Sequence, residues 1–556
     1  VLTRPFVLTL VLVVGAVIIG YFPPFIGRHG PYQEDAVFIN LLHRMDGGMQ
    51  PYRDFEFLYG PMMIAPIAWL ARLTGFSPIT YYVYYAVLES VVAALLVWWA
   101  FRRIPDSRER YLAIIVLLAL LLNPFLGINY NGLRRLLPVI AVATLAVGRD
   151  SSRLRIVSAV IAGFALSYAH EMGTAAVAGA GAVFAVALLR GEGSTRASVI
   201  RDGLIYLAVA VVSWLGFIAL ALGRGTDDYL REIASLVPRF AAGEAGLTFS
   251  WTLNALALFA LLSLGLVLIG AGLGSRGRSR ISSTPGDRFV IASVAIAIVA
   301  LKSGLTRADM YHLDTGIVAL GMAFLFPVNT RVLAMPPRVR RLGMLCIATI
   351  GATYAFGNLP TISMIARGWV RGGRDVISGQ KRSELTFAPA APSLIAMSTA
   401  RNPAFVALAS HVAEPERRGK PVLFYGRLWA LGPIIGVYKR DHLNDDFIYS
   451  DARGQRERTF LEANPDALVL MNVPAYERLW GIRPDSVFDR SEYGMPPSLV
   501  KRVASKLSSV HYDAAPLESR LHAMRWRRTV GDYVRAHFDS VAAFGSIIVL
   551  QRRSSG

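Results

Sequence analysis

The sequence predicts a polytopic α-helical membrane protein of about eleven transmembrane helices, followed by an extracytoplasmic α/β domain. Three observations predict this fold class. Of 556 residues, 54% are hydrophobic and 17% are charged, whereas soluble domains carry about 25% charged residues. Apolar runs long enough to cross a bilayer recur up to about residue 360. The polar tail that follows contains short strand-like runs between helical stretches.

Each predicted span is a mostly apolar run close to the length of about 20 residues that a bilayer requires. The first run, Leu8–Tyr21, is similar to a signal peptide, but no small-residue cleavage site follows it, so we interpret it as a retained span. The predicted spans are residues 5–22, 80–100, 111–127, 133–148, 155–172, 173–190, 203–223, 251–273, 288–305, 313–328 and 341–358.

The topology depends on a twelfth apolar run, residues 61–73, which is short and contains two prolines and Arg72. If this run crossed the membrane, every later arginine-rich loop would lie outside. If it is instead an amphipathic helix on the membrane surface, the positive-inside rule is obeyed. The basic loops then placed in the cytoplasm are 101–110, 149–154, 190–202, 274–288 and 330–341.

This second topology places the N-terminus in the cytoplasm and makes residues 23–79 a long first outer loop. The predicted domains are a transmembrane module at 1–360 and a periplasmic or extracellular α/β domain at 361–556. Strands are expected at 421–426, 467–472 and 545–553. Frequent alanine and arginine are typical of a bacterium with a GC-rich genome, so we expect the bacterial inner (plasma) membrane.

The net charge of +20 has two interpretations, a nucleic-acid partner or arginines in cytoplasmic loops that attract anionic lipid. In a membrane protein the second interpretation needs no additional partner beyond the bilayer, so we predict membrane lipid and no nucleic acid as a partner. The only cysteine, Cys346, excludes an intrachain disulfide and a cysteine-rich metal site.

Unusual polar residues gather on the outer side of the predicted membrane module. Ionisable groups at membrane depth are costly and mark functional sites by default. Because four groups lie at one membrane face, we expect one shared site for a base and an anion. The groups are Asp35; Asn129, Asn131, Arg134 and Arg135; His170 and Glu171; and Lys302, Arg307, Asp309, His312 and Asp314.

Each group also has a structural alternative. The arginines at 134–135 would anchor the end of a span, and residues 170–171 would form a buried pair with each other. Lys302 would extend its ammonium group to the interface. Asp35 would be a helix N-cap or first-turn acid. The pattern at 307–312, which sets three charged or polar residues within six positions at a membrane surface, favours function.

The first loop resembles a known superfamily. Glu34-Asp35 soon after the first span, and then GGMQPYRDFEFLYGPM at 47–62, are similar to motifs of the polyprenyl-phosphate-dependent glycosyltransferases of the GT-C fold, which include protein O-mannosyltransferases and lipid A aminoarabinose transferases. The plan of about eleven spans and an outer C-terminal domain is also similar. The chain departs from the usual pattern in its reversed acid pair and in YGP at 59–61, where many relatives have KPP. The WWDYG motif of oligosaccharyltransferases is absent, which disfavours en bloc transfer of an oligosaccharide to asparagine.

The resemblance implies transfer of a sugar from a polyprenyl-phosphate donor to an acceptor hydroxyl on the outer face, with inversion of the anomeric centre. It implies that Asp35 is the general base. The residues expected to bind the donor phosphate are Arg134, Arg307, His312 and Lys302. Those expected to bind or orient substrates are Glu34, Asp54, Arg53, His170, Glu171 and Asp309. The acceptor class is left open among a glycan, a lipid and a protein.

No cofactor is indicated, and a divalent metal is left open. The acid pairs in 226–228 and 444–446 are typical of solvated loops, and no His, Asp and Glu set has convincing ligand spacing. Two other functions are weighed. A secondary transporter is expected to show repeats and interrupted helices at the bilayer midplane. An O-antigen ligase or polysaccharide polymerase is expected to concentrate arginines and a histidine in a late outer loop, whereas 224–250 has three arginines and no histidine.

Overall fold

The computed structural model describes the larger part of the chain. The described residues are 3–21, 38, 41–75, 78–121, 131–190, 195–241, 253–274, 284–306, 316, 318–323, 338, 341–353, 366, 370, 403–425, 443–445, 451–480 and 527–553, without 43, 56, 58, 415–416, 418–419 and 546.

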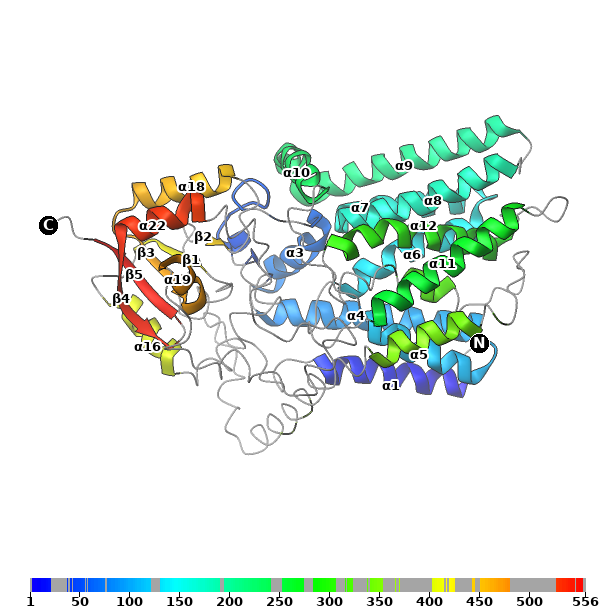
Figure 1. Ribbon diagram of the computed structural model, residues 1–556, viewed down its shortest axis with the longest axis horizontal. Helices are drawn as coiled ribbons and strands as arrows, with labels where there is room; N and C mark the ends of the chain where they lie inside the picture. Colours follow the sequence, from blue (N-terminus) through cyan, green and yellow to red (C-terminus); the bar gives the residue numbers. More distant parts are fainter. Residues whose placement is uncertain are drawn as a thin grey trace.

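A bundle of long helices forms the N-terminal part of the described structure (Figure 1). Its members coincide with nine of the predicted spans, and 313–328 and 341–358 are described only in part, as helical residues 318–323 and 341–353. The members are α1 (Arg4–Tyr21), α4 (Pro78–Arg103), α5 (Ser107–Leu121), α6 (Asn131–Gly148), α7 (Ser152–Tyr168), α8 (His170–Arg190), α9 (Arg196–Leu222), α11 (Leu253–Gly274) and α12 (Pro285–Thr306).

The outer surface of the bundle is apolar. On α9, Leu204, Val212 and Leu220 are each more than half exposed, at 62%, 69% and 63%. Such a surface is unfavourable in water and suits the hydrocarbon of a bilayer. In the described part of the chain, four helical segments are long and apolar enough to cross a membrane by length and composition: 83–103, 131–148, 170–189 and 196–235.

The boundary between α7 and α8 lies at Ala169, three residues before the end of the predicted span 155–172. The chain leaves the helical conformation at Ala169 (φ −153°, ψ 115°), and α8 starts at His170. The break carries no proline or glycine, so hydropathy alone could not locate it. The first loop stabilises it, because the Gly60 N–H donates to the Tyr168 carbonyl over 3.1 Å. His170 and Glu171 therefore lie in the first turn of α8 rather than in a loop.

The run at 61–73 does not span the bundle. It forms η2 (Pro61–Met63) and α3 (Ala65–Thr74), and the 10 residues of α3 extend about 15 Å, half the thickness of a bilayer core. The length of this helix fits the predicted non-spanning segment, and its position on the membrane surface stays a prediction. Its inner face is more buried than a surface helix requires, since Met63, Ile64 and Ile67 are fully buried, whereas Leu73 is 85% exposed.

The C-terminal part contains a five-stranded sheet of order β2-β1-β3-β5-β4. β1 (Val422–Tyr425) is parallel to β2 (Leu443–Asp445) and β3 (Leu468–Asn472), while β5 (Ile547–Arg552) pairs antiparallel with β3 and β4 (Phe538–Phe544). The strands expected in 421–426, 467–472 and 545–553 are therefore present.

Helices cover both faces of this sheet. On one face, Leu423, Val469 and Leu550 pack with residues of α18 (Asp451–Ala463), α19 (Val473–Trp480) and α22 (Asp532–His537), the last preceded by η4 (Arg527–Gly531). On the other face, Phe424 and Val549 pack with α16 (Pro403–Ala413). Alternate residues of each strand thus face different layers, as expected for a buried sheet between helices.

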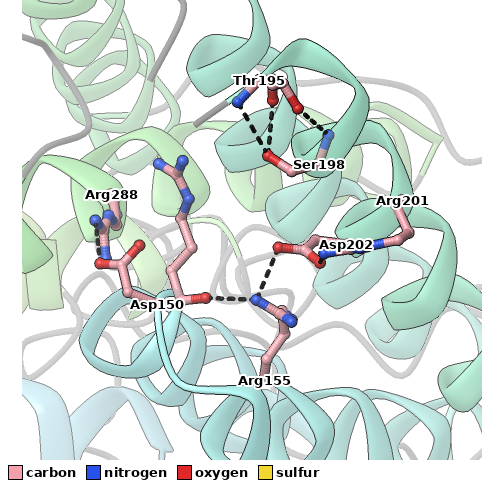
Figure 2. Close-up of polar contacts among 8 residues, drawn as sticks. Asp150, Arg155, Thr195, Ser198, Arg201, Asp202 and Arg288 are labelled. Carbon is pink, nitrogen blue, oxygen red and sulfur yellow. Dashed lines mark hydrogen bonds and ion pairs between the residues drawn. The ribbon is translucent and has the colours of Figure 1, made fainter. Parts of the chain in front are cut away.

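The two ends of the helical bundle have different neighbours. In Figure 1 the N-terminus lies at one end, and the sheet domain lies beyond the other, on the side of α3, η3 (Gly223–Gly225) and α10 (Thr226–Ala241). Figure 2 shows ion pairs that join helix ends: Arg288 of α12 with Asp150 at 2.9 Å, and Arg155 of α7 with Asp202 of α9 at 3.0 Å. The first pair ties the α6–α7 turn to the first turn of α12, and the second ties the first turn of α7 to the second turn of α9.

The contact of the first loop with the α7–α8 break predicts the effect of a single methyl group. A Cβ at Gly60 would overlap the Ser167 carbonyl, so Gly60→Ala is expected to lower the stability of the purified protein by about 1–3 kcal/mol. Thermal unfolding in lipid nanodiscs measures this. Gly181→Ala in α8 is the control, because nothing lies within 4 Å of its Cβ. Equal unfolding temperatures for both variants would contradict the described docking.

Candidate functional site

The PYRD stretch of the first loop, residues 51–54, is a tight turn. The Asp54 carboxylate accepts a hydrogen bond from the Gln50 N–H at 2.7 Å, and the Tyr52 N–H donates to the Phe55 carbonyl at 2.8 Å. Tyr52 has φ +69°, the left-handed conformation that tight turns require. Asp54 also pairs with Arg53 at 2.9 Å. Asp54 therefore stabilises the turn. The turn places the Tyr52 side chain in the protein interior and leaves Arg53 exposed at the surface.

Tyr52 fixes this turn to the rest of the protein. Its side chain is buried, its hydroxyl donates to the Tyr59 carbonyl at 2.5 Å, and its ring lies edge-on to Tyr229 of α10 at 4.9 Å between centroids. Burial raises the pKa of the Tyr52 hydroxyl well above its ordinary value, with the neighbouring Tyr229 and Glu232 as further causes. The group therefore stays a hydrogen-bond donor at any physiological pH.

Arg134 is the cation that the first loop contacts. Its Nε donates to the Glu171 Oε1 at 2.8 Å, its Nη2 forms an ion pair with the same oxygen, and its Nη1 donates to the Asn131 side chain at 3.1 Å. The Tyr59 ring lies over the guanidinium with 4.9 Å between Cζ and the ring centroid. Arg134 is thus held by the first turns of α6 and α8 and by the first loop.

The helix ends add to the positive field of this region. Asn131 and Arg134 occupy the first turn of α6, and Glu171 occupies the first turn of α8. A helix N-terminus carries a partial positive charge and free N–H groups, which attract anions. Glu171 supplies the counter-charge in the resting structure, with its side chain one-third exposed, at 33%, and that of Arg134 at 15%. The region therefore offers an anion one cation and two helix N-termini.

His170 contacts a different partner from its neighbour in sequence. Its Nδ1 lies 3.2 Å from the Tyr229 hydroxyl, and the two rings are 5.6 Å apart. Glu171 pairs with Arg134 instead, so the alternative in which His170 and Glu171 satisfy each other is wrong. His170 connects α8 to α10, and Tyr229 in turn connects it to the first loop.

The structure brings three of the predicted site residues together: Arg134, His170 and Glu171. The alternative in which residues 134–135 only anchor a helix end does not fit Arg134, which pairs with Glu171 of α8, and Arg135 is buried. Arg53 and Asp54 lie on the turn that carries Tyr52. The expected residues Glu34, Asp35, Arg307, Asp309 and His312 lie outside the described residues, and Lys302 belongs to α12 with its side chain undescribed.

Sequence reasoning missed four residues around this region. Tyr52, Tyr59 and Tyr229 form the aromatic contacts, and Glu89 is buried within α4. A lone acid inside the predicted span 80–100 was a visible signal for Glu89. The contacts of Tyr229 had no signal, because they join residues far apart in sequence.

No group of three or more His, Cys, Asp or Glu residues is arranged to hold a metal within the described ranges. Asp227 and Asp228, one of the acid pairs in the sequence, lie in the first turn of α10, where acids favour the helix dipole, and Asp228 pairs with Arg231 at 2.9 Å.

Comparison with known proteins gives structural similarity only. No family model and no curated protein match the chain. Among solved structures, ArnT from Cupriavidus metallidurans bound to undecaprenyl phosphate is similar over 98% of both chains, at 12% sequence identity and a TM-score of 0.43. ArnT in the apo state is similar over 98% of this chain and 97% of its own, at 13% sequence identity and a TM-score of 0.43. An Archaeoglobus fulgidus oligosaccharyltransferase tethered to an acceptor peptide is similar over 99% of this chain and 89% of its own, at 11% sequence identity and a TM-score of 0.46.

At such low identities and TM-scores the similarity carries no argument about chemistry, so the function has to be argued from the chain's own residues.

The ion pair predicts a measurable coupling. In a double-mutant cycle with Arg134→Gln and Glu171→Gln, the coupling free energy of unfolding is expected to be about 1–3 kcal/mol, because each single change leaves a partly buried charge without its partner. Arg231→Gln with Asp228→Asn is the control cycle: Arg231 is 77% exposed, and an exposed pair contributes about 1 kcal/mol or less. Coupling near zero for the first pair would show that Glu171 does not hold Arg134.

Proposed function

We propose that this protein is a membrane glycosyltransferase of the GT-C type, which moves a sugar from a polyprenyl-phosphate donor to an acceptor hydroxyl on the outer membrane face. The observation that carries this proposal is the placement of Arg134. A guanidinium is held at the convergence of two helix N-termini and under an aromatic ring of the first loop, next to an outward-facing turn. This is an arrangement that suits a lipid-linked phosphate.

The membrane orientation is part of the proposal. The first loop, the starts of α6 and α8, and α10 contact one another, and Figure 1 shows the sheet domain beyond the same end of the bundle. With the positive-inside rule, this end is outside, in the periplasm of a bacterium, where nucleotide sugars are not available and lipid-linked sugars serve as donors. The proposal keeps about eleven spans, a transmembrane module at 1–360 and an outer domain at 361–556.

The proposed reaction is a single displacement. The acceptor oxygen attacks the anomeric carbon while its proton passes to the Asp35 carboxylate, and the bond from that carbon to the phosphate oxygen breaks with its electron pair remaining on the phosphate. Positioning of the base contributes more than its basicity, since an aspartate has a pKa near 3.9 in water. The charge that develops on the leaving phosphate requires fixed cations, the role proposed for Arg134, Arg307, His312 and Lys302.

Other residues have supporting roles in this proposal. Glu171 orients Arg134 through the ion pair in the resting protein. When the donor binds, its phosphate replaces the Glu171 carboxylate as the partner of Arg134. His170 and Asp309 orient the substrates, Glu34 supports Asp35, and Arg53 with Asp54 shapes the outer rim of the site. The acceptor is a glycan, a lipid or a protein, and a divalent metal is left open.

The alternative of an O-antigen ligase or polymerase depends on arginines in the 224–250 connection. Arg231, one of the three, pairs with Asp228 of its own helix and is largely exposed, which does not indicate a buried catalytic group. For a secondary transporter, the described ion pair lies at the ends of α6 and α8 rather than at a helix interruption near the bilayer midplane. Both alternatives receive less support than the transferase.

Replacement of the proposed base gives the direct test of activity. Asp35→Asn is expected to lower transfer of radiolabelled sugar from polyprenyl phosphate by at least about a hundredfold, because the amide cannot accept the proton. Membranes that contain equal amounts of each variant are compared. Asp46→Asn, a change at an exposed acid of the same loop, is the control and should leave transfer unchanged. Transfer by Asp35→Asn at the wild-type rate would remove this residue from the mechanism and direct attention to Glu34 and Asp54.

The stereochemistry of the product tests the single displacement. A donor with a β-linked phosphate is expected to yield an α-linked product, and an α-linked donor a β-linked product. Nuclear magnetic resonance of the purified product measures the anomeric coupling. Retention of configuration would require two displacements and a covalent intermediate, which would sink the proposed mechanism.

A further inference from the structure

A buried carboxylate lies inside the helical bundle below the candidate site. Glu89 is 2% exposed, and it lies in α4 between the first turn at Pro78 and the basic last turn with Arg102 and Arg103. At 1.5 Å per residue it lies about 16 Å along the helix from Pro78, close to the middle of α4. An ionisable side chain at this depth is costly, so chance retention is a poor explanation for it.

The buried face of α4 connects Glu89 with the first loop. Tyr81, Tyr85 and Glu89 are spaced four residues apart and therefore share one face of the helix, and all three are buried. The Tyr81 and Tyr85 rings contact each other at 4.8 Å, and the Tyr85 hydroxyl donates to the Met63 carbonyl at 3.2 Å. The row of Tyr81, Tyr85 and Glu89 thus contacts the first loop at Met63 and ends at the Glu89 carboxylate.

Tyr168 links the carboxylate with the cationic site. It is the last residue of α7 and is 1% exposed, and α6, the helix that carries Arg134, packs against both α7 and α4, the helix that carries Glu89. Its carbonyl accepts the Gly60 N–H, at the joint where the first loop meets α8. In a medium of low dielectric constant, charges on helices that pack against each other interact appreciably.

We propose that Glu89 is a positioning residue whose negative charge offsets the cations at Arg134, so that the polyprenyl-phosphate product is released rather than retained. This inference rests on the proposed function. A site with only cations would bind the lipid phosphate in both donor and product, and tight binding of a product lowers turnover. A fixed carboxylate below the site weakens the field that the phosphate meets without occupying its place.

The test measures equilibrium binding of polyprenyl phosphate, and of uncharged polyprenol, to the purified full-length protein in nanodiscs. Glu89→Gln removes the charge at nearly constant shape. It is expected to bind polyprenyl phosphate about tenfold more tightly than the wild type, the scale of interaction between unit charges roughly 10 Å apart at an effective dielectric constant near 20. Affinity for polyprenol should not change, because that lipid carries no charge.

Two further variants separate charge from packing. Glu89→Asp keeps the charge and should restore affinity to within about threefold of the wild type. Ser90→Ala removes only a hydroxyl that bonds to the Ala86 carbonyl of the same helix, at 2.6 Å, and should have no effect. In turnover assays, Glu89→Gln should lower KM for the lipid donor and kcat together, whereas a merely structural defect would lower kcat or the folded fraction without tighter binding.

The outcomes separate the two proposals. If the wild type prefers polyprenyl phosphate to polyprenol and Glu89→Gln binds it no more tightly, the role of Glu89 is overturned and the proposed function stands. If the wild type shows no preference for the phosphate, the proposed function falls and the role of Glu89 falls with it.

Discussion

The guanidinium of Arg134 is the contact on which the end of the bundle next to the first loop depends. It joins three segments distant in sequence: its own first turn of α6, Glu171 in the first turn of α8, and the Tyr59 ring in the first loop. Without this cation, Glu171 would keep a partly buried negative charge without its partner, and the first loop would lose its cation–π contact. The Gly60 contact with the α7–α8 break and the Tyr52 contact with α10 extend from the same junction.

The helical elements were largely predictable because their signal is local. Runs of about 20 apolar residues located most of the described helices to within a few residues, and the proline-rich run at 61–73 was correctly separated from the spans. The break between α7 and α8 was predicted three residues too late, because no proline or glycine marks Ala169 and its stabilising partner, Gly60, lies more than a hundred residues earlier. Contacts between distant segments determine where such a helix break falls, and a hydropathy pattern carries no information about those contacts.

The candidate site was predictable in its residue types and only partly in its pairings. The structure brings Arg134 and Glu171 together and places the Tyr59 ring of the first loop over Arg134. The shared site with Asp35 and residues 302–314 stays a prediction. The pairing of Glu171 with Arg134 rather than with His170 follows from helix packing, which a single sequence does not reveal. Glu89 was overlooked because the search considered span ends and not their interiors, although a carboxylate in an apolar helix is itself a signal.

The claim that Arg134 binds the donor phosphate is tested most directly by equilibrium binding of polyprenyl phosphate to Arg134→Gln, Arg134→Lys and wild-type protein in nanodiscs. The account predicts at least about tenfold weaker binding for Arg134→Gln, with part of the affinity retained by Arg134→Lys, since lysine keeps the charge but not the bidentate geometry. Arg201→Gln is the control, because Arg201 is 71% exposed and belongs to the Asp202 cluster of Figure 2. Equal affinity of Arg134→Gln and wild type, with both proteins folded, would contradict the central claim.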